Sequence, residues 1–179
     1  MKRSRRYMQS RDIDWFFRSS GNLIHCASNG GLLPEIVADI DYLESSGKIV
    51  AAMEDVITDD SDIFINNGHV DAIVREQREL IRSVRERTEF DDDWLNEVSI
   101  RSNYLDTFVK MARKGIWSYD RVGGEDGSYV LVARPEDANV KPDFSLNANG
   151  FVKMNVLVEN EGGMMTIPQC FFKSRFLDS

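Results

Sequence analysis

Residues 105–122, LDTFVKMARKGIWSYDRV, contain the change of hydrophobic period that decides the fold. Leu105 and Phe108 are separated by the spacing of one helix face, and the stripe continues on both sides of them. Basic side chains near the end of this stripe suit the negative end of a helix, and Gly115 is a typical stop. After Gly115, apolar and polar residues alternate, as they do in a strand. The stretch therefore predicts a helix followed by a strand over 116–122.

Alternating patterns of the same kind occur near both ends of the chain. Residues 12–18 and 23–27 form one predicted hairpin, with Ile13, Trp15 and Phe17 on one face of its first strand. Gly-rich and Asn-rich turns separate the later strands. The complete set of expected later strands is 116–122, 128–134, 151–159 and 166–172, with a short strand or loop at 63–65.

Helical spacing is confined to the middle of the chain, where it predicts helices over 35–55, 70–88 and 92–114. Strands grouped at both ends with helices between them are typical of an α+β fold. We expect a mainly antiparallel sheet, built from an N-terminal hairpin and C-terminal hairpins, with about three helices packed on one face. The expected core consists of Trp15, Ile40, Ile73, Leu80, Ile81, Trp94, Leu105, Phe108, Leu131 and Leu157.

The length of 179 residues favours one α+β domain over residues 11–179, preceded by a basic flexible arm over residues 1–10. Net charge is −8 and is unevenly distributed. Residues 1–31 carry six basic and two acidic side chains, whereas residues 32–115 carry ten basic and nineteen acidic ones. The acidic surface makes nucleic acid an improbable partner, because it repels a phosphate backbone.

Composition and motifs narrow the classes of function further. No apolar run approaches the length of a membrane-spanning helix, so we expect a cytoplasmic protein without a membrane partner. The two cysteines and two histidines show no metal-ligand spacing, and no sequence pattern identifies a cofactor. A homo-oligomer is an open alternative, because edge strands can pair between copies.

The segment His25-Cys26-Ala27-Ser28-Asn29-Gly30-Gly31 is the first candidate site. An imidazole on a strand is followed by a hydroxyl, an amide and two glycines, whose backbone N–H groups could face an anion. This pattern makes His25 a candidate catalytic residue, and the candidate ligand-binding residues are Ser28, Asn29, Gly30 and Gly31. The structural alternative is a histidine bonded within the sheet and a tight turn that leads into a helix.

The second candidate site is the strand after Gly115. Alternation places Trp117, Tyr119 and Arg121 on one face, where they could stack on a planar ring and hold a phosphate or carboxylate. Tyr119 is therefore a candidate catalytic residue, and Trp117 and Arg121 are candidate ligand-binding residues. The structural alternative is an aromatic ladder with Tyr129 on the neighbouring strand.

Together, residues 23–28 and 115–120 resemble two strands of the ADP-ribosyltransferase superfamily, in which a His and a small hydroxyl residue lie on the first core strand. The resemblance covers about a dozen residues. It implies that His25 contacts the ribose of NAD and that Tyr119 stacks near the nicotinamide. Glu159 and Glu161 are the positions open for the catalytic glutamate, and the two segments lie further apart than in the superfamily.

Two functions follow as hypotheses. The first is a binding or regulatory module that engages a protein partner or a small ligand, because catalytic motifs such as a nucleotide-binding glycine loop are absent. The second is a nucleotide-handling or NAD-handling enzyme centred on His25 and the Asn29-Gly30-Gly31 loop. The observation that distinguishes these two hypotheses is whether the loop and the Trp117–Arg121 strand line one pocket.

Overall fold

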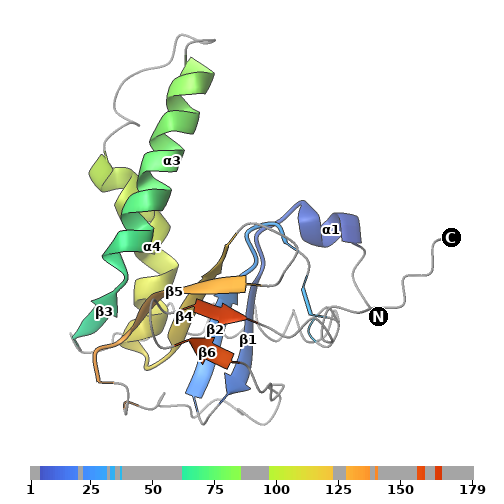
Figure 1. Cartoon of the computed structure of the whole chain (residues 1–179), viewed down its shortest axis with the longest axis vertical. Helices are drawn as coiled ribbons and strands as arrows, with labels where there is room; N and C mark the ends of the chain where they lie inside the picture. The colour runs from blue at the N-terminus through green and yellow to red at the C-terminus, as the bar shows by residue number, and fades with distance from the viewer. Residues whose placement is uncertain are drawn as a thin grey trace, which may run out of the picture.

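The structure is a computed structural model that describes residues 5–19, 22–31, 33, 34, 37, 62–85, 97–122, 128–137, 140, 157–159 and 164–166. Its elements form one mixed sheet with helices against it (Figure 1). The helices are α1 (Arg5–Gln9), α3 (Asn67–Arg85) and α4 (Glu97–Arg113). The strands are β1 (Asp14–Ser19), β2 (Asn22–Ala27), β3 (Ile63–Ile65), β4 (Trp117–Arg121), β5 (Ser128–Pro135), β6 (Leu157–Glu159) and β7 (Met164–Thr166).

The predicted α+β class and the mainly antiparallel sheet are confirmed. Strand order is β1-β2-β4-β5-β7-β6, and β3 pairs with the end of β5. The hairpins β1–β2 and β4–β5 lie where the alternation predicted them. β2 and β4 pair in parallel, although they are far apart in the sequence. A parallel pair needs a long crossover, and the chain that connects β2 to β4 contains α3 and α4.

The two long helices cover one face of the sheet. α4 contacts β5 and β4, and α3 contacts α4 and β5. Figure 1 shows the two helices side by side, with the C-terminal end of α3 extending beyond the sheet. The core on this face consists of Ala27, Val70, Val74, Ile100, Leu105, Phe108, Ala112, Val132 and Ala133. No helix among the described residues is both long enough and apolar enough to cross a membrane.

A second hydrophobic core lies on the opposite face of the sheet. It contains Met8, Trp15, Phe17, Ile24, Cys26, Leu33, Val37, Tyr119, Tyr129, Leu131 and Met165. Met8 belongs to α1, so a helix forms within the segment that the sequence predicted as a flexible arm, and its methionine is buried. The Cys26 thiol is free, and burial raises its pKa well above the ordinary value.

Helix α3 begins three residues earlier than its apolar pattern predicted, because Asn66 caps it. The Asn66 side-chain oxygen accepts the N–H of His69, and its backbone carbonyl accepts the N–H of Val70. The Asn66 side-chain amide also donates to the carbonyl of Leu131 in β5. These contacts fix the start of α3 to the sheet next to a β-bulge between β4 and β5.

Three expectations need correction. Leu80 is 63% exposed rather than buried, because the C-terminal half of α3 extends past the sheet. Ile81, also in that half, is half-buried for the same reason, and Ile73 in the N-terminal half is half-buried because it lines the cleft described below. Strand β7 begins at Met164, before the predicted range 166–172, because the residues directly after the turn pair with β6.

Other expectations are confirmed or lie outside the described residues. Trp15, Leu105, Phe108 and Leu131 are buried as predicted. Helix α4 matches the predicted 92–114 over residues 97–113. The parts of the prediction that lie outside the described residues are most of the helix at 35–55, the helix residues 86–88 and 92–96, the strand residues 151–156 and 167–172, Ile40, Trp94 and the side chain of Leu157.

Candidate functional site

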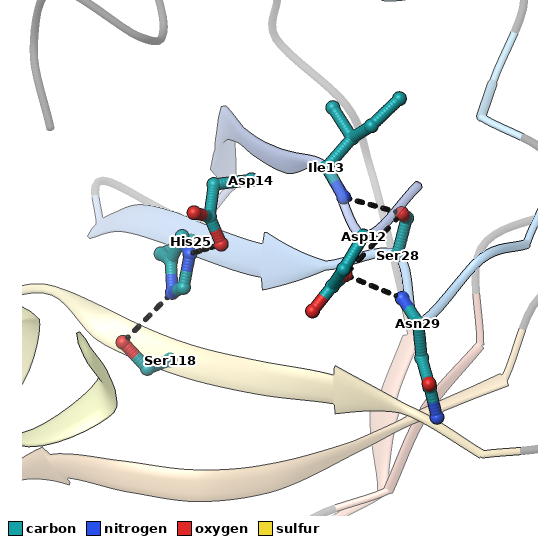
Figure 2. A network of polar contacts seen from close by, with 7 residues as sticks. All are labelled: Asp12, Ile13, Asp14, His25, Ser28, Asn29 and Ser118. Atoms are coloured by element: carbon teal, nitrogen blue, oxygen red, sulfur yellow. Dashed lines mark hydrogen bonds and ion pairs between the residues drawn. The ribbon is translucent and has the colours of Figure 1, made fainter. Parts of the chain in front are cut away.

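His25 lies on β2 and faces the helices. Its side chain is fully buried and packs between the rings of Phe16 and Phe108. Its Nε2 lies 2.9 Å from Asp14 Oδ1 on β1, and its Nδ1 lies 3.2 Å from Ser118 Oγ on β4 (Figure 2). The parallel pairing of β2 with β4 creates this chain, because it places His25 directly opposite Ser118.

The two ends of this chain differ in access to solvent. A neutral imidazole satisfies both contacts when Nε2–H donates to the Asp14 carboxylate and the Ser118 hydroxyl donates to Nδ1. Asp14 is 38% exposed, whereas Ser118 is fully buried. A serine, a histidine and an aspartate are therefore connected, but the hydroxyl is at the closed end. The arrangement orients the Asp14 carboxylate and does not present a serine nucleophile.

The glycine loop is held by a second set of contacts, also drawn in Figure 2. Asp12 Oδ1 accepts the backbone N–H of Asn29 at 2.7 Å and the Ser28 hydroxyl at 3.4 Å. Ser28 Oγ in turn accepts the N–H of Ile13 at 2.8 Å. Asn29 and Gly30 have positive φ angles of 45° and 67°. Glycine adopts such an angle without strain. The Gly31 N–H bonds to the Ser28 carbonyl, so the N–H groups of Asn29 and Gly31 are both used within the protein.

A third polar chain leads to Asp120 on β4. Tyr104 of α4 donates its hydroxyl hydrogen to Asp120 Oδ2 at 2.8 Å. His69 Nε2 lies 3.0 Å from the Tyr104 oxygen and 3.9 Å from Asp120. Burial, and then the charge of Asp120, raises the pKa of Tyr104, so this hydroxyl keeps its proton and stays a donor. The Asp120 carboxylate is thus held in place from the helix side.

These carboxylates border one cleft between the strand ends and the two long helices. Its volume is about 420 Å³. The lining residues are Asp12, Asp14, Ala27, Asn29, Ile73, Glu76, Gln77, Leu80, Asn103, Tyr104, Thr107, Phe108 and Asp120. Four of them are acidic and none is basic. Desolvation, followed by repulsion from Asp14 and Asp120, raises the pKa of Asp12, although the Asn29 N–H bond opposes the shift.

The two segments that the sequence singled out lie on neighbouring parallel strands, but most of their candidate residues lie on opposite faces of the sheet. Asn29 lines the cleft, and His25 lies directly behind Asp14. Trp117 and Tyr119 pack in or against the core on the opposite face, which also contains Tyr129. The guanidinium of Arg121 lies against Gly31, so close that a Cβ at this glycine would be 2.0 Å from Nη1. The two segments therefore meet at one cleft through Ala27, Asn29 and Asp120, whereas the candidate ligand-binding face of Trp117, Tyr119 and Arg121 does not line it.

Sequence reasoning did not identify the acidic residues of the cleft. Asp12 precedes an aromatic strand and Asp14 begins it, and the alternation pattern gives neither residue a role in a site. Asp120 follows from alternation as a neighbour of Ser118 on the helix side, but only the fold shows that this face borders a cleft. Glu76 sits in a helix with many other charges. The missing signal was the parallel β2–β4 pair, which periodicity does not reveal.

Within the described residues, no group of three or more His, Cys, Asp or Glu side chains is arranged to hold a metal ion. Comparisons with protein-family models, with curated proteins and with solved structures find no match for this chain.

Proposed function

We propose that this protein is a binding module whose acidic cleft takes a small organic cation, such as an amine or a guanidinium compound. The observation that carries the proposal is a cleft of about 420 Å³ with four carboxylates and no basic side chain in its lining. These carboxylates come from three places in the chain: Asp12 and Asp14 at the start of β1, Glu76 on α3 and Asp120 on β4. Desolvation raises the pKa of Asp12 and repulsion from Asp14 and Asp120 adds to the shift; a bound cation would relieve this repulsion.

The rest of the lining supports an organic ligand. Ile73, Leu80 and Phe108 give the cleft an apolar wall that could contact a hydrocarbon body. Asn103 and Thr107 add neutral polar groups that could orient the ligand. The volume lies within the ~300–1,000 Å³ usual for small-molecule sites. The proposed module acts in the cytoplasm, as the sequence predicts.

The same lining gives less support to the nucleotide-handling alternative at this cleft. A phosphate beside the glycine loop would face Asp12 and Asp14, and like charges at close range disfavour binding. The N–H group of Asn29, which an anion would need, already donates to Asp12. A cation is the ligand that the local charge favours.

Agmatine, which carries a guanidinium and an ammonium group on a short hydrocarbon chain, is a suitable probe. We expect saturable binding by isothermal titration calorimetry that weakens as salt is added. Glu76→Gln should weaken this binding about two- to fivefold, the range for a partly exposed ion pair. Glu79→Gln is the matched control, because Glu79 lies on the same helix, is exposed and does not line the cleft.

The experiment also includes NAD and ADP, for which a rise in melting temperature reports binding. The proposal is wrong if agmatine does not bind, or if Glu79→Gln weakens its binding as much as Glu76→Gln. Binding of NAD or ADP in the cleft, detected as a loss of affinity in Asn29→Ala without any agmatine effect, would support the nucleotide-handling alternative instead.

A further inference from the structure

The carboxylates that line the cleft fall into two groups. The three aspartates, Asp12, Asp14 and Asp120, lie at the strand ends. Glu76, the fourth carboxylate, lies on α3. After desolvation, the charges of Asp14 and Asp120 raise the pKa of Asp12, and the charge of Glu76 is not among these causes. The aspartates therefore act on one another as a cluster, and Glu76 is separate from them.

Helix α3 shows where the separate glutamate lies. Its four lining residues, Ile73, Glu76, Gln77 and Leu80, recur at the spacing of one helix face, so they form one wall of the cleft. This wall is about 10 Å long, because each residue advances a helix by about 1.5 Å. After Val74, none of the side chains that the structure describes in α3 is buried, and Figure 1 shows this end of the helix extending beyond the sheet. Glu76 therefore belongs to the open end of the cleft.

The aspartate end of the cleft is the more enclosed one. Asp120 is 5% exposed, and its Oδ2 accepts the hydrogen of the Tyr104 hydroxyl. The strand register places Asp120 opposite Ala27, so this end lies at the carboxyl ends of the parallel strands β2 and β4. Sheets with parallel strands and helices commonly bind ligands at this position. The cleft thus runs from a buried carboxylate to an exposed one.

The wall between the two ends is apolar. Ile73 and Leu80 flank Glu76 on α3, three residues before it and four residues after it, and Phe108 of α4 lines the same cleft. Leu80 is 63% exposed, which is unusual for a leucine inside a cleft. A hydrocarbon chain that reaches Glu76 along this wall removes apolar surface from water, and this burial favours binding.

From this arrangement we propose that the ligand of the cleft is an elongated dication, with a cationic group at each end of an aliphatic chain. The inference rests on the proposed function and adds recognition at two points. One cationic group binds the three aspartates, the other binds Glu76, and the aliphatic chain lies against α3. A planar guanidinium suits the aspartate end, because it donates to several carboxylate oxygens at once. An ammonium group suits the single carboxylate at the open end.

Agmatine and 1-pentylguanidine distinguish recognition at two points from recognition at one. Pentylguanidine is agmatine with a methyl group in place of the ammonium group, so it keeps the guanidinium and loses the second charge. Isothermal titration calorimetry measures both compounds with the wild type, Glu76→Gln, Asp14→Asn and the control Glu79→Gln. Asparagine at position 14 keeps an oxygen that can accept the Nε2–H of His25. The melting temperature of each variant without ligand checks that it is folded.

The two carboxylate variants should have different effects. Glu76→Gln should weaken agmatine binding about two- to fivefold, the range for a partly exposed ion pair, and leave pentylguanidine binding unchanged. Asp14→Asn should weaken the binding of both compounds by a similar factor, because both carry the guanidinium. Glu79→Gln should change neither affinity, because Glu79 does not line the cleft.

Failure of this inference is distinguishable from failure of the proposed function. If both compounds bind and Glu76→Gln weakens them equally, or weakens neither, the cleft binds cations but recognition at two points is wrong. The inference is also wrong if Asp14→Asn leaves pentylguanidine binding unchanged, because the guanidinium then does not bind at the aspartates. If neither compound binds, the proposed function and this inference both fail.

Discussion

His25 shows how the environment of one residue changes what a substitution at it would measure. The sequence makes it a candidate catalytic residue on a strand, or a histidine bonded within the sheet. In the structure it is fully buried, contacts two aromatic rings and satisfies both Asp14 and Ser118. His25→Ala would leave a cavity and an unpaired serine hydroxyl, so its main effect would be on stability. Binding in the cleft is better tested through its exposed carboxylates.

Asp12 allows a prediction at the same scale, about pH and stability. Its folded pKa is raised above the unfolded value of 3.8, so the cost of its charge is absent below that pH and appears as pH rises through the folded pKa. Asp12→Asn keeps an oxygen that can accept the Asn29 N–H. The variant should therefore be more stable than the wild type at pH 7, by up to about 1 kcal/mol for a surface charge.

Urea unfolding at several pH values measures this difference, which should shrink as the pH falls toward 3.8. Asp106→Asn is the control, because Asp106 pairs with Lys110 at 2.8 Å on the surface of α4 and its loss should slightly destabilise the protein at pH 7. An Asp12→Asn protein that is less stable than the wild type at pH 7 would show that the hydrogen bonds of the carboxylate outweigh its desolvation and repulsion.

At the scale of the elements, periodicity predicted which segments are helices and strands. The packing of these segments in the fold determines which of their side chains are buried and which residues they contact. The stripe from Val70 to Val84 correctly indicates a helix, but the same pattern continues where α3 has passed the edge of the sheet. Half of the stripe is therefore only partly covered by the described residues. Alternation likewise placed Tyr119 and Ser118 on opposite faces. It could not show that Ser118 meets His25, because these residues are 93 positions apart and their contact depends on a parallel pair.

Two residues of α3 allow the covered and the exposed parts of its apolar stripe to be compared by experiment. Val74 is 2% exposed and Leu80 is 63% exposed, although both lie on the apolar stripe. Val74→Ala should lower the free energy of unfolding by about 1.5–3 kcal/mol, the value of a buried valine side chain and the gap left behind. Leu80→Ala should lower it by about 0.5 kcal/mol or less, as surface substitutions do. Urea denaturation of both variants checks this order, and an equal loss would mean that Leu80 is covered in solution.

At the scale of the whole molecule, one sheet separates two hydrophobic cores. Each of the central strands β2, β4 and β5 contributes side chains to both cores or to the polar chains between them. The N-terminal hairpin is joined to the β4–β5 hairpin by the parallel β2–β4 pair and by the contact of Trp15 with Tyr129. Neither core can form without strands that the other also uses. This arrangement argues that the described strands and helices unfold as one cooperative unit.

Cooperativity of the two cores can be tested by comparing probes from opposite faces. Trp15 and Trp117 report on the core opposite the long helices, whereas α3 and α4, the two long helices of the described residues, contribute to the far-ultraviolet circular dichroism signal. Because the sheet is shared, tryptophan fluorescence and circular dichroism should give the same midpoint and the same slope during urea unfolding. Val74→Ala, a change on the helix side, should move both transitions by the same amount. A fluorescence transition that stays in place while the helical signal shifts would show that the two faces unfold separately.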